Sequence, residues 1–211
     1  MAQRVEDGKE GPDRAVRRDV GIVVPLRSFT FAKARLGDVL DPTARALLAR
    51  GMADRVVRAA GPYPVAIVSS ALEVCEWAVA RDLDVIGDPG SLDAAAAAGR
   101  EWARESGFER FAIVHADLPR ITTLDAVVAD GGAPVAVVVP DHRHDGTPVL
   151  SLPTAADFTF SFGPDSASRH VAEAERLGLE VRVVNDPDLA FDVDVPADLA
   201  ALVAYEHATT S

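Results

Sequence analysis

The stretch FAIVHADLPRIT, residues 111–122, decides how we interpret the fold of this chain. Its apolar run, Phe111 to His115, predicts a buried strand that stops before Asp117. Ligands of open α/β sheets bind at the carboxyl ends of the strands, so an acid at this position is a candidate metal ligand. The alternative is that Asp117 caps a following helix, because aspartate is common at N-caps. On this stretch alone, both interpretations stay open.

Similar apolar runs alternate with helical patterns along the chain. Strands are predicted at residues 20–24, 65–68, 85–86, 111–115, 135–139 and 181–184, with an antiparallel run at 149–152. Helices are predicted at residues 42–60, 72–81, 91–106, 122–130, 166–177 and from 195 onward. This alternation predicts an α/β fold: a single doubly wound, mostly parallel sheet flanked by helices. We expect a mobile leader at 1–19, one domain at 20–204 and a tail at 205–211.

Composition narrows the class of protein. The chain has 211 residues, a net charge of −12, 48% hydrophobic residues and 26% charged residues, which suits one globular domain. An acidic chain lacks the basic face that nucleic-acid binding needs. Its single cysteine, Cys75, excludes an intramolecular disulfide and fits a reducing compartment. With no apolar run of membrane-spanning length and no signal-peptide core, we expect a cytoplasmic protein without nucleic-acid or membrane partners.

A basic loop follows the first predicted strand. Arg27, Lys33 and Arg35 lie within nine residues of one another, which predicts a local anion site able to hold a triphosphate. The chain has only two lysines, Lys9 and Lys33, so Lys33 stands out as a compact point charge. The alternative is a solvated loop.

A second acidic segment lies near the C-terminus. Asp192 and Asp194 alternate, so an extended segment would point both carboxylates to one side. Two adjacent acids repel each other unless a cation lies between them, and hard oxygen ligands suit Mg²⁺ bound with substrate phosphates. The alternatives are that Asp194 caps the final helix and that Asp198 lies in its first turn for dipole reasons. We accept the latter for Asp198.

Glycines and hydroxyls form a third group. The Thr147 and Ser166 hydroxyls are candidates for binding a second, smaller phosphate or carboxylate, with Gly163 allowing close backbone approach. Ordinary turn chemistry explains them equally well. Arg169 and His170 are expected to face either an anionic ligand or water. The His-rich segment 141–145 is more typical of a polar loop than of a zinc site.

The chain lacks the G-x-S-x-G, G-x-x-x-x-G-K and Rossmann glycine motifs, which argues against hydrolase, P-loop and dehydrogenase functions. Seven other short motifs occur in one order: Val23–Arg27 with Ala32–Leu36, Ala116–Pro119, Asp145–Thr147, Phe162–Ser166 with Arg169-His170, and Asp192–Leu199. This ordered set, which spans residues 20–203, resembles the 2-phospho-L-lactate guanylyltransferase family. Relatives of that family include phosphoenolpyruvate guanylyltransferases, and its enzymes work in coenzyme F-420 biosynthesis.

The resemblance implies a fold of the nucleotidyltransferase (nucleotide-diphospho-sugar transferase) type. It also implies Mg²⁺-dependent transfer of GMP from GTP onto a small phosphorylated carboxylic acid, phosphoenolpyruvate or 2-phospho-L-lactate, with release of pyrophosphate. Such an acceptor phosphate is already ionised near neutral pH, so the reaction needs positioning and cations rather than a general base. A homodimer and hand-over of a labile product to the next enzyme of the pathway are compatible with the resemblance.

The resemblance assigns roles residue by residue. The metal ligands of the family correspond to Asp117, Asp192 and Asp194, and its basic nucleotide loop corresponds to Lys33 and Arg35. We therefore expect Lys33, Arg35 and Asp117 to be catalytic. The residues expected to bind substrate are Arg27, Thr147, Gly163, Ser166 and Arg169.

Three departures from the family pattern leave specificity open. Arg27 stands where many members have lysine, and Asp93 and Pro148 stand where asparagine is expected. The proline removes an N–H and the aspartate removes an amide. Phosphoenolpyruvate, 2-phospholactate and 3-phosphoglycerate all stay open as acceptor, and so does the strictness of the GTP preference. The alternatives are a related nucleotidyltransferase for another phosphorylated acid or sugar phosphate, and a non-catalytic nucleotide-binding paralogue.

Overall fold

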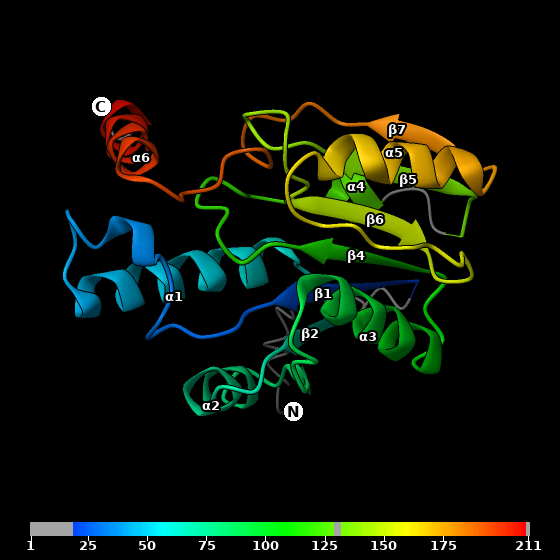
Figure 1. The fold of residues 1–211 in the computed structure, drawn as a ribbon. Coiled ribbons are helices and arrows are strands. Elements are labelled where there is room, and N and C mark those ends of the chain that lie inside the picture. Colours follow the sequence, from blue (N-terminus) through cyan, green and yellow to red (C-terminus); the bar gives the residue numbers. More distant parts are fainter. Residues whose placement is uncertain (1–18, 129–131, 210–211) are drawn as a thin grey trace, which may run out of the picture.

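The computed structural model describes residues 19–128 and 132–209. Its centre is one seven-stranded sheet in the order β3-β2-β1-β4-β6-β5-β7 (Figure 1). The strands are β1 (Val20–Pro25), β2 (Val65–Val68), β3 (Asp84–Ile86), β4 (Arg110–Val114), β5 (Val135–Val139), β6 (Val149–Pro153) and β7 (Glu180–Val183). β6 runs antiparallel to β4 and β5, and the other neighbouring pairs are parallel. The mostly parallel sheet and its one antiparallel strand are as predicted.

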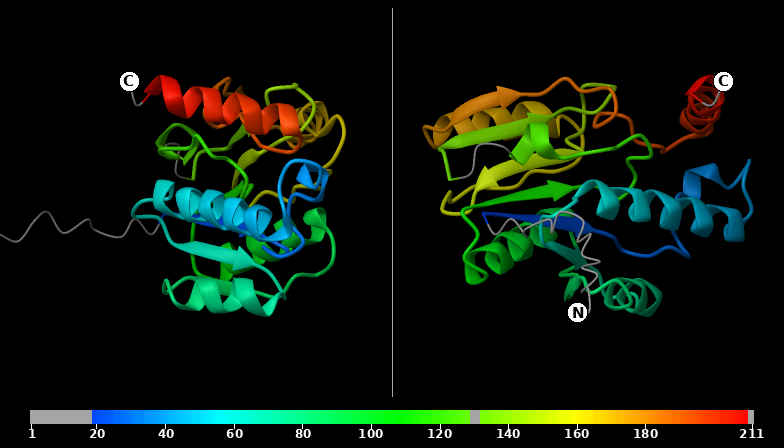
Figure 2. Two further views of the ribbon diagram at one scale, coloured as in Figure 1. Left: turned by 90° about the vertical axis from the view of Figure 1, so that its left-hand side faces the viewer. Right: turned by 180° about the vertical axis from the view of Figure 1, so that it is seen from behind.

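Helices cover both faces of the sheet (Figures 1 and 2). They are α1 (Pro42–Ala59), α2 (Leu72–Val79), α3 (Leu92–Glu105), α4 (Asp125–Val128), α5 (Ser166–Arg176) and α6 (Pro196–Thr209), with a 3₁₀ turn, η1 (Ala34–Leu36). α1, α2 and α4 bury their apolar side chains on one face, and α3 and α5 do so on the other. Because successive side chains of a strand point to opposite faces, Ile22 and Val24 join the first core and Val23 joins the second. The predicted doubly wound fold is confirmed.

Small residues bring α3 close to the sheet. Ala95, Ala96 and Ala103 are buried on the face of α3 that meets the strands. A Cβ atom at Gly99 would collide with the side chain of Val23, so only glycine permits this approach. These small residues therefore hold α3 close to the sheet. They also fix the position of Leu92, the first residue of α3.

α6 lies apart from the sheet, beyond the carboxyl ends of its parallel strands (Figure 2). A third, smaller apolar cluster of Leu36, Met52, Phe191, Val193 and Leu202 joins it to η1 and α1. This arrangement directs the segment before α6 across the end of the sheet.

Several boundaries differ from the predicted ones. α4 is shorter than the predicted helix at 122–130; residues 129 and 130 lie outside the described part of the chain, as does the predicted leader apart from Asp19. The Thr123 hydroxyl accepts a hydrogen bond from the Asp125 N–H, so the helix begins after the threonines. α6 runs to Thr209, past position 204. Across residues 19–128 and 132–209, we find no helix with the length and apolar character needed to cross a membrane.

Candidate active site

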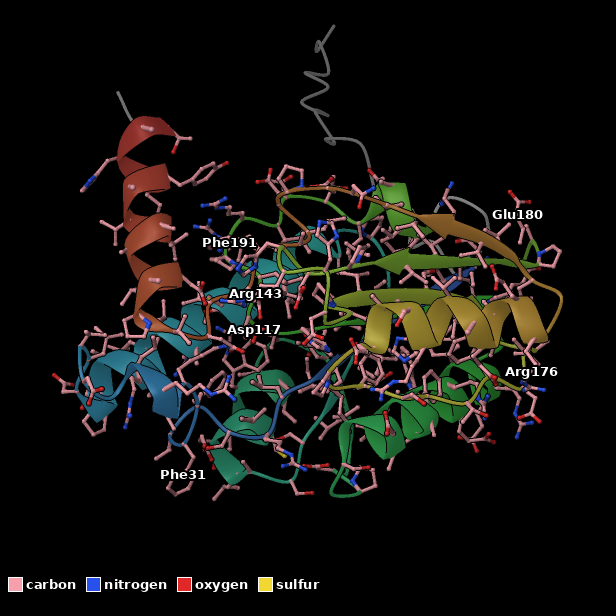
Figure 3. All side chains as sticks on the ribbon, turned by 45° about the horizontal axis from the view of Figure 1, so that its top comes forward. Phe31, Asp117, Arg143, Arg176, Glu180 and Phe191 are labelled. Atoms are coloured by element: carbon pink, nitrogen blue, oxygen red, sulfur yellow. The ribbon has the colours of Figure 1, made fainter. Side chains whose placement is uncertain are left out.

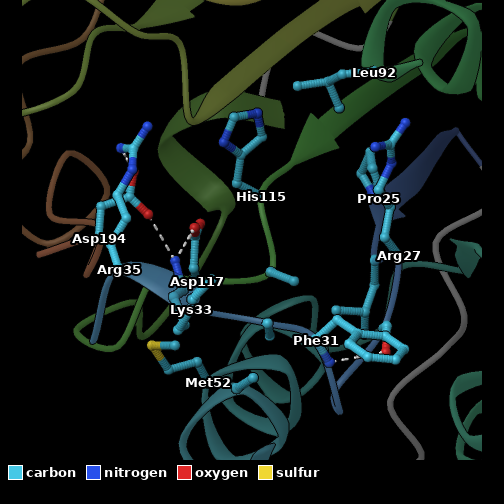
Figure 4. Close-up of a pocket in the computed structure, with 16 residues that line it drawn as sticks. Pro25, Arg27, Phe31, Lys33, Arg35, Met52, Leu92, His115, Asp117 and Asp194 are labelled. Carbon is cyan, nitrogen blue, oxygen red and sulfur yellow. Dashed lines mark hydrogen bonds and ion pairs between the residues drawn. The ribbon is translucent and has the colours of Figure 1, made fainter. Parts of the chain in front are cut away.

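A pocket of about 650 Å³ opens at the carboxyl ends of β1 and β4 (Figure 4). The loop after β1 forms much of its wall, and α1, α3 and the segment after β4 complete it. The lining residues are Pro25, Leu26, Arg27, Ser28, Phe31, Ala32, Lys33, Ala34, Arg35, Ala49, Met52, Leu92, His115, Ala116, Asp117 and Asp194. Figure 3 shows Asp117, Arg143 and Phe191 at this end of the molecule, with Arg176 and Glu180 at the other. The pocket therefore lies where open α/β sheets bind ligands.

Three carboxylates meet beside the pocket, and we call Asp117, Asp192 and Asp194 the acidic cluster. Two of them, Asp117 and Asp194, line the pocket. One carboxylate oxygen of each of the three lies within 4.8 Å of the others. Asp117 follows β4, and no helix begins there, since α4 starts only at Asp125. The alternative interpretation of Asp117 as a helix cap is therefore excluded. Phe191 and Val193 are buried in the third cluster, which leaves Asp192 and Asp194 to point together toward Asp117.

Lys33 lies inside the acidic cluster. Its Nζ donates hydrogen bonds to Asp117 Oδ2 at 2.6 Å and to Asp194 Oδ1 at 2.9 Å (Figure 4). The backbone of Lys33 adopts a left-handed conformation, φ 54°, which costs a non-glycine residue about 1 kcal/mol. Arg35, one turn on, places NH1 3.8 Å from Asp194 Oδ2. A strained backbone thus aims a buried ammonium at two acids.

The charges in this group depend on one another. Burial would lower the pKa of Lys33, but the Asp117 and Asp194 carboxylates outweigh it and raise that pKa above its usual value. Burial would likewise raise the pKa of Asp117, and the Lys33 ammonium reverses the effect, so the pKa of that carboxyl lies below its usual range. Lysine and aspartate are therefore both charged at neutral pH.

Asp192 differs from its two neighbours. Its Oδ1 lies 3.1 Å from His142 Nδ1 and 3.5 Å from Arg143 NH1, but neither contact has hydrogen-bond geometry. Among the described residues, this buried oxygen and Asp117 Oδ1 both lack a hydrogen-bond partner. Burial, followed by repulsion from the other two acids, raises the pKa of Asp192 to about 6. Buried carboxylate oxygens without partners are costly, and a bound cation would satisfy them.

A second layer holds the acidic cluster from behind. Arg143 donates to both oxygens of Asp198, at 2.7 and 2.8 Å. Asp198 in turn accepts the N–H groups of Asp194, at 2.9 Å, and Val195, at 3.0 Å. Asp198 therefore holds the backbone of Asp194 in place, in addition to the helix-dipole role expected for Asp198. The side chain of Asp194 accepts from Lys33 and does not serve as the alternative helix cap.

His142 was not among the expected site residues. Its backbone N–H donates to the Ala190 carbonyl at 2.9 Å, and its ring lies on Phe191, with 5.4 Å between ring centroids. The surrounding segment is the polar loop that the sequence favoured, because the Asp141 carboxylate accepts the N–H groups of Arg143, Asp145 and Gly146. Nothing in the spacing of the motif indicates that this loop reaches Asp192.

Thr147, Ser166 and His170 form a separate, buried group that we call the hydroxyl network. Thr147 Oγ1 lies 3.0 Å from Ser166 Oγ and 3.0 Å from His170 Nδ1. The Ser161 N–H donates to His170 Nε2 at 3.2 Å, which places the ring proton on Nδ1 and makes Thr147 the acceptor. Burial, then the charge of Arg169, lowers the pKa of His170 to about 4, so the ring is neutral. The expectation that His170 faces ligand or water is wrong, because its side chain is fully buried.

The other expected substrate-binding residues lie beside these two groups. Arg169 is exposed, and its guanidinium donates to the Ser161 carbonyl at 2.9 Å. Gly163 has φ 108°, a conformation that favours glycine. Arg27 lies across the pocket from Lys33 (Figure 4), where it donates to the Gly90 carbonyl and lies 3.6 Å from Asp88. The structure thus brings Lys33, Arg35 and the acidic cluster together. Arg27 lines the same pocket, whereas Thr147, Gly163, Ser166 and Arg169 do not.

His115 was also not among the expected site residues. It lines the pocket two residues before Asp117, and its backbone N–H donates to the Pro148 carbonyl at 2.9 Å. Its ring lies 5.7 Å, centroid to centroid, from Phe162. Burial lowers the pKa of this imidazole, and its buried Nε2 has no hydrogen-bond partner among the described residues.

Comparison with known proteins identifies the family. The model of the family described as "Guanylyl transferase CofC like" matches residues 20–211. The chain belongs to this family. The phosphoenolpyruvate guanylyltransferase of Rubrobacter xylanophilus is 41% identical over 86% of this chain and 92% of that protein. The 2-phospho-L-lactate guanylyltransferase of Methanothermobacter thermautotrophicus is 29% identical over 89% of this chain and 85% of that protein.

Two solved structures share the fold of this guanylyltransferase. A putative nucleotide-diphospho-sugar transferase from Desulfovibrio desulfuricans G20 has a TM-score of 0.69 at 17% identity, covering 87% of this chain and 86% of that chain. The CMP:2-keto-3-deoxy-manno-octonic acid synthetase complexed with CTP has a TM-score of 0.55 at 17% identity, covering 89% and 99%. The predicted nucleotide-diphospho-sugar transferase type of fold is confirmed.

Two departures from the guanylyltransferase pattern, Asp93 and Pro148, make contacts that the structure shows. The Asp93 Oδ1 accepts the Phe162 N–H at 2.7 Å, a bond that the oxygen of an asparagine amide could accept as well. Pro148 uses its carbonyl to hold His115. Neither residue lines the pocket.

Proposed function

We propose that this guanylyltransferase moves GMP from GTP onto phosphoenolpyruvate or 2-phospho-L-lactate, with Mg²⁺ and release of pyrophosphate, as a step of coenzyme F-420 biosynthesis in the cytoplasm. The observation that carries the proposal is the acidic cluster with Lys33 at its centre, at one end of the pocket. Relatives named for both acceptors support the choice of substrate.

The residues present fit a magnesium ion. Three carboxylates within reach of one another offer hard oxygen ligands, and two of their buried oxygens have no hydrogen-bond partner among the described residues. Asp117, Asp192 and Asp194 would hold the ion. When bound, Mg²⁺ would neutralise charge on the phosphates and on the leaving pyrophosphate.

The side chains supply charge and position. An acceptor phosphate oxygen forms a bond to the α-phosphorus of GTP, the bond from that phosphorus to the oxygen bridging to the β-phosphate breaks, and its electron pair leaves with pyrophosphate. No proton has to move, because the acceptor phosphate is already ionised. In this proposal Lys33 leaves the acids when a cation replaces it, and with Arg35 it then binds the triphosphate.

The acceptor would lie on the α5 side of the acidic cluster. Thr147, Gly163, Ser166 and Arg169 lie at or beside the start of α5. His115 lines the pocket near Asp117, and its ring lies 5.7 Å, centroid to centroid, from Phe162. Because the two hydroxyls are buried and bonded to each other, we propose that they set the spacing between β6 and α5. The exposed Arg169 guanidinium would then meet the anion.

The test is a panel of acceptors and nucleotides. Pyrophosphate release is measured with GTP and Mg²⁺ against phosphoenolpyruvate, 2-phospho-L-lactate and 3-phosphoglycerate, and each product is identified by its mass. We expect a guanylylated product with one of the first two acids. Turnover only with CTP or ATP would favour a related nucleotidyltransferase, and no pyrophosphate release with any pair would favour a non-catalytic paralogue.

Two features of the assembly also belong to the proposal. A homodimer and hand-over of the labile product to the next enzyme rest on the family alone. Light scattering on the purified chain tests the first, and product lifetime with and without that enzyme tests the second.

A further inference from the structure

The pocket has two chemically different ends. Lys33, Arg35, Asp117 and Asp194 make one end strongly charged. The other end, across the hollow in Figure 4, is formed by Pro25, Arg27, Phe31 and Leu92. A nucleoside triphosphate has the same polarity, since its triphosphate is charged and its base is flat and largely apolar on its faces.

Phe31 is the most unusual residue of the second end. It is 84% exposed although it lines the pocket. Phe29, two residues earlier in the same loop, is 5% exposed and packs edge-on against Trp77 at 5.4 Å. The loop thus places the Phe29 ring in the core and leaves the Phe31 ring exposed on the pocket rim, where a bound ligand would bury it.

The turn that carries Phe31 is held in place. The Glu73 carboxylate accepts the Ser28 hydroxyl at 2.7 Å and the Thr30 N–H at 3.5 Å. Ser28 Oγ in turn accepts the Phe31 N–H at 3.3 Å. A ring presented by a bonded turn loses less conformational freedom when it stacks than a ring on a loose loop does.

We propose that Phe31 is a stacking platform for the base of the bound nucleotide. The inference rests on the proposed function and adds a residue to it: the triphosphate lies at Lys33 and Arg35, and the base lies on Phe31. Every base has a π-face, so stacking raises affinity for nucleotides in general. Phe31 therefore contributes affinity for the nucleotide and not the choice of guanine.

The test compares two truncations of exposed apolar side chains. Phe31→Ala removes the platform, and Leu72→Ala is the matched control, because Leu72 is 72% exposed but does not line the pocket. We expect Phe31→Ala to raise the Kd for Mg·GTP, measured by calorimetry, about tenfold, and Leu72→Ala to leave it unchanged. The KM of the acceptor should stay at the wild-type value in both. Phe31→Trp should restore affinity, and GTP should quench the fluorescence of the new indole.

The outcomes separate this inference from the proposed function. An unchanged GTP Kd in Phe31→Ala, in a protein whose wild-type form makes a guanylylated product, would overturn the platform alone. A raised acceptor KM with unchanged GTP affinity would also overturn it. A wild-type chain that releases no pyrophosphate from GTP with any acceptor would overturn the proposed function.

Discussion

The hydroxyl network is a buried polar group and the acidic cluster a partly buried one, and the two differ in how completely their hydrogen bonds are satisfied. In the hydroxyl network, Thr147, Ser166 and His170 bond to one another and to the Ser161 N–H, and among the described residues no side-chain N or O atom of the three is without a partner. In the acidic cluster, buried oxygens of Asp117 and Asp192 have no hydrogen-bond partner in the same part of the chain.

The two groups therefore contribute to different properties of the protein, one to stability and the other to ligand binding. A satisfied buried network stabilises one arrangement of the backbone, here the start of β6 against the start of α5. Unsatisfied buried carboxylates destabilise the protein by themselves, so they are expected where a ligand completes them. Substitutions should therefore affect activity in one group and stability in the other.

The largest expected effect is on turnover, from the acidic cluster. Asp117→Asn keeps the size of the side chain but removes the charge that would bind a cation and that now pairs with Lys33. Pyrophosphate release should fall by more than about 100-fold, while the far-UV circular dichroism stays that of the wild type. Asp157→Asn, at a fully exposed carboxylate, is the control. A near wild-type rate in Asp117→Asn would remove this residue from the metal site.

A smaller effect should come from the layer behind the cluster. His142 lies 3.1 Å from Asp192 without being a proposed metal ligand, so His142→Ala should loosen that carboxylate and weaken Mn²⁺ binding by about 10–100-fold. Electron paramagnetic resonance of free Mn²⁺ measures this without substrate. His144→Asn, in the same exposed loop, serves as control. Equal Mn²⁺ affinity in the two variants would show that His142 does not position Asp192.

The sequence predicted the sheet well because strand signals are local. The apolar runs at residues 65–68 and 135–139 bury every side chain, as parallel strands covered on both faces require. It also predicted that Asp192 and Asp194 share a side, since alternation with buried Phe191 and Val193 decides their direction. Such patterns need no knowledge of distant contacts.

Contacts between distant segments could not be predicted in this way. Arg143 and Asp198 meet across 55 positions of the chain, and neither carries a periodic signal that identifies the other. His170 follows an exposed arginine at a helix start, and only the packing of α5 on the sheet shows that its ring is buried. The roles assigned to Lys33, Arg35 and the substrate-binding residues stay predictions that the variants above can test.

Asp192 should couple pH to the stability of the metal-free protein. Its pKa is raised to about 6 in the folded chain, against about 3.9 when unfolded. A carboxyl that holds its proton more tightly when folded stabilises the fold below its unfolded pKa, and that contribution is lost as pH rises through about 6. Asp192→Asn should therefore be more stable than the wild type at pH 7.5, on the order of 2 kcal/mol, and equally stable near pH 4.

Urea unfolding in the presence of a chelator measures this difference at each pH. Saturating Mg²⁺ should reverse the order, since only the wild type retains all three acids. Parallel pH profiles for the two proteins would show that Asp192 is not destabilised by its neighbours.

The smallest expected effect belongs to the hydroxyl network. Thr147→Val keeps the shape of the side chain but leaves His170 Nδ1–H and Ser166 Oγ without their partner. The free energy of unfolding should fall by about 1–2 kcal/mol, because buried donors lose a bond that water cannot replace. Turnover of the folded protein should change less than about fivefold, a difference worth under ~1 kcal/mol. Ser168→Ala, at an exposed hydroxyl of the same helix, is the control. If Thr147→Val instead lost as much turnover as Asp117→Asn at undiminished stability, its hydroxyl would have to contact substrate, and the network would be as open to ligand as the acidic cluster.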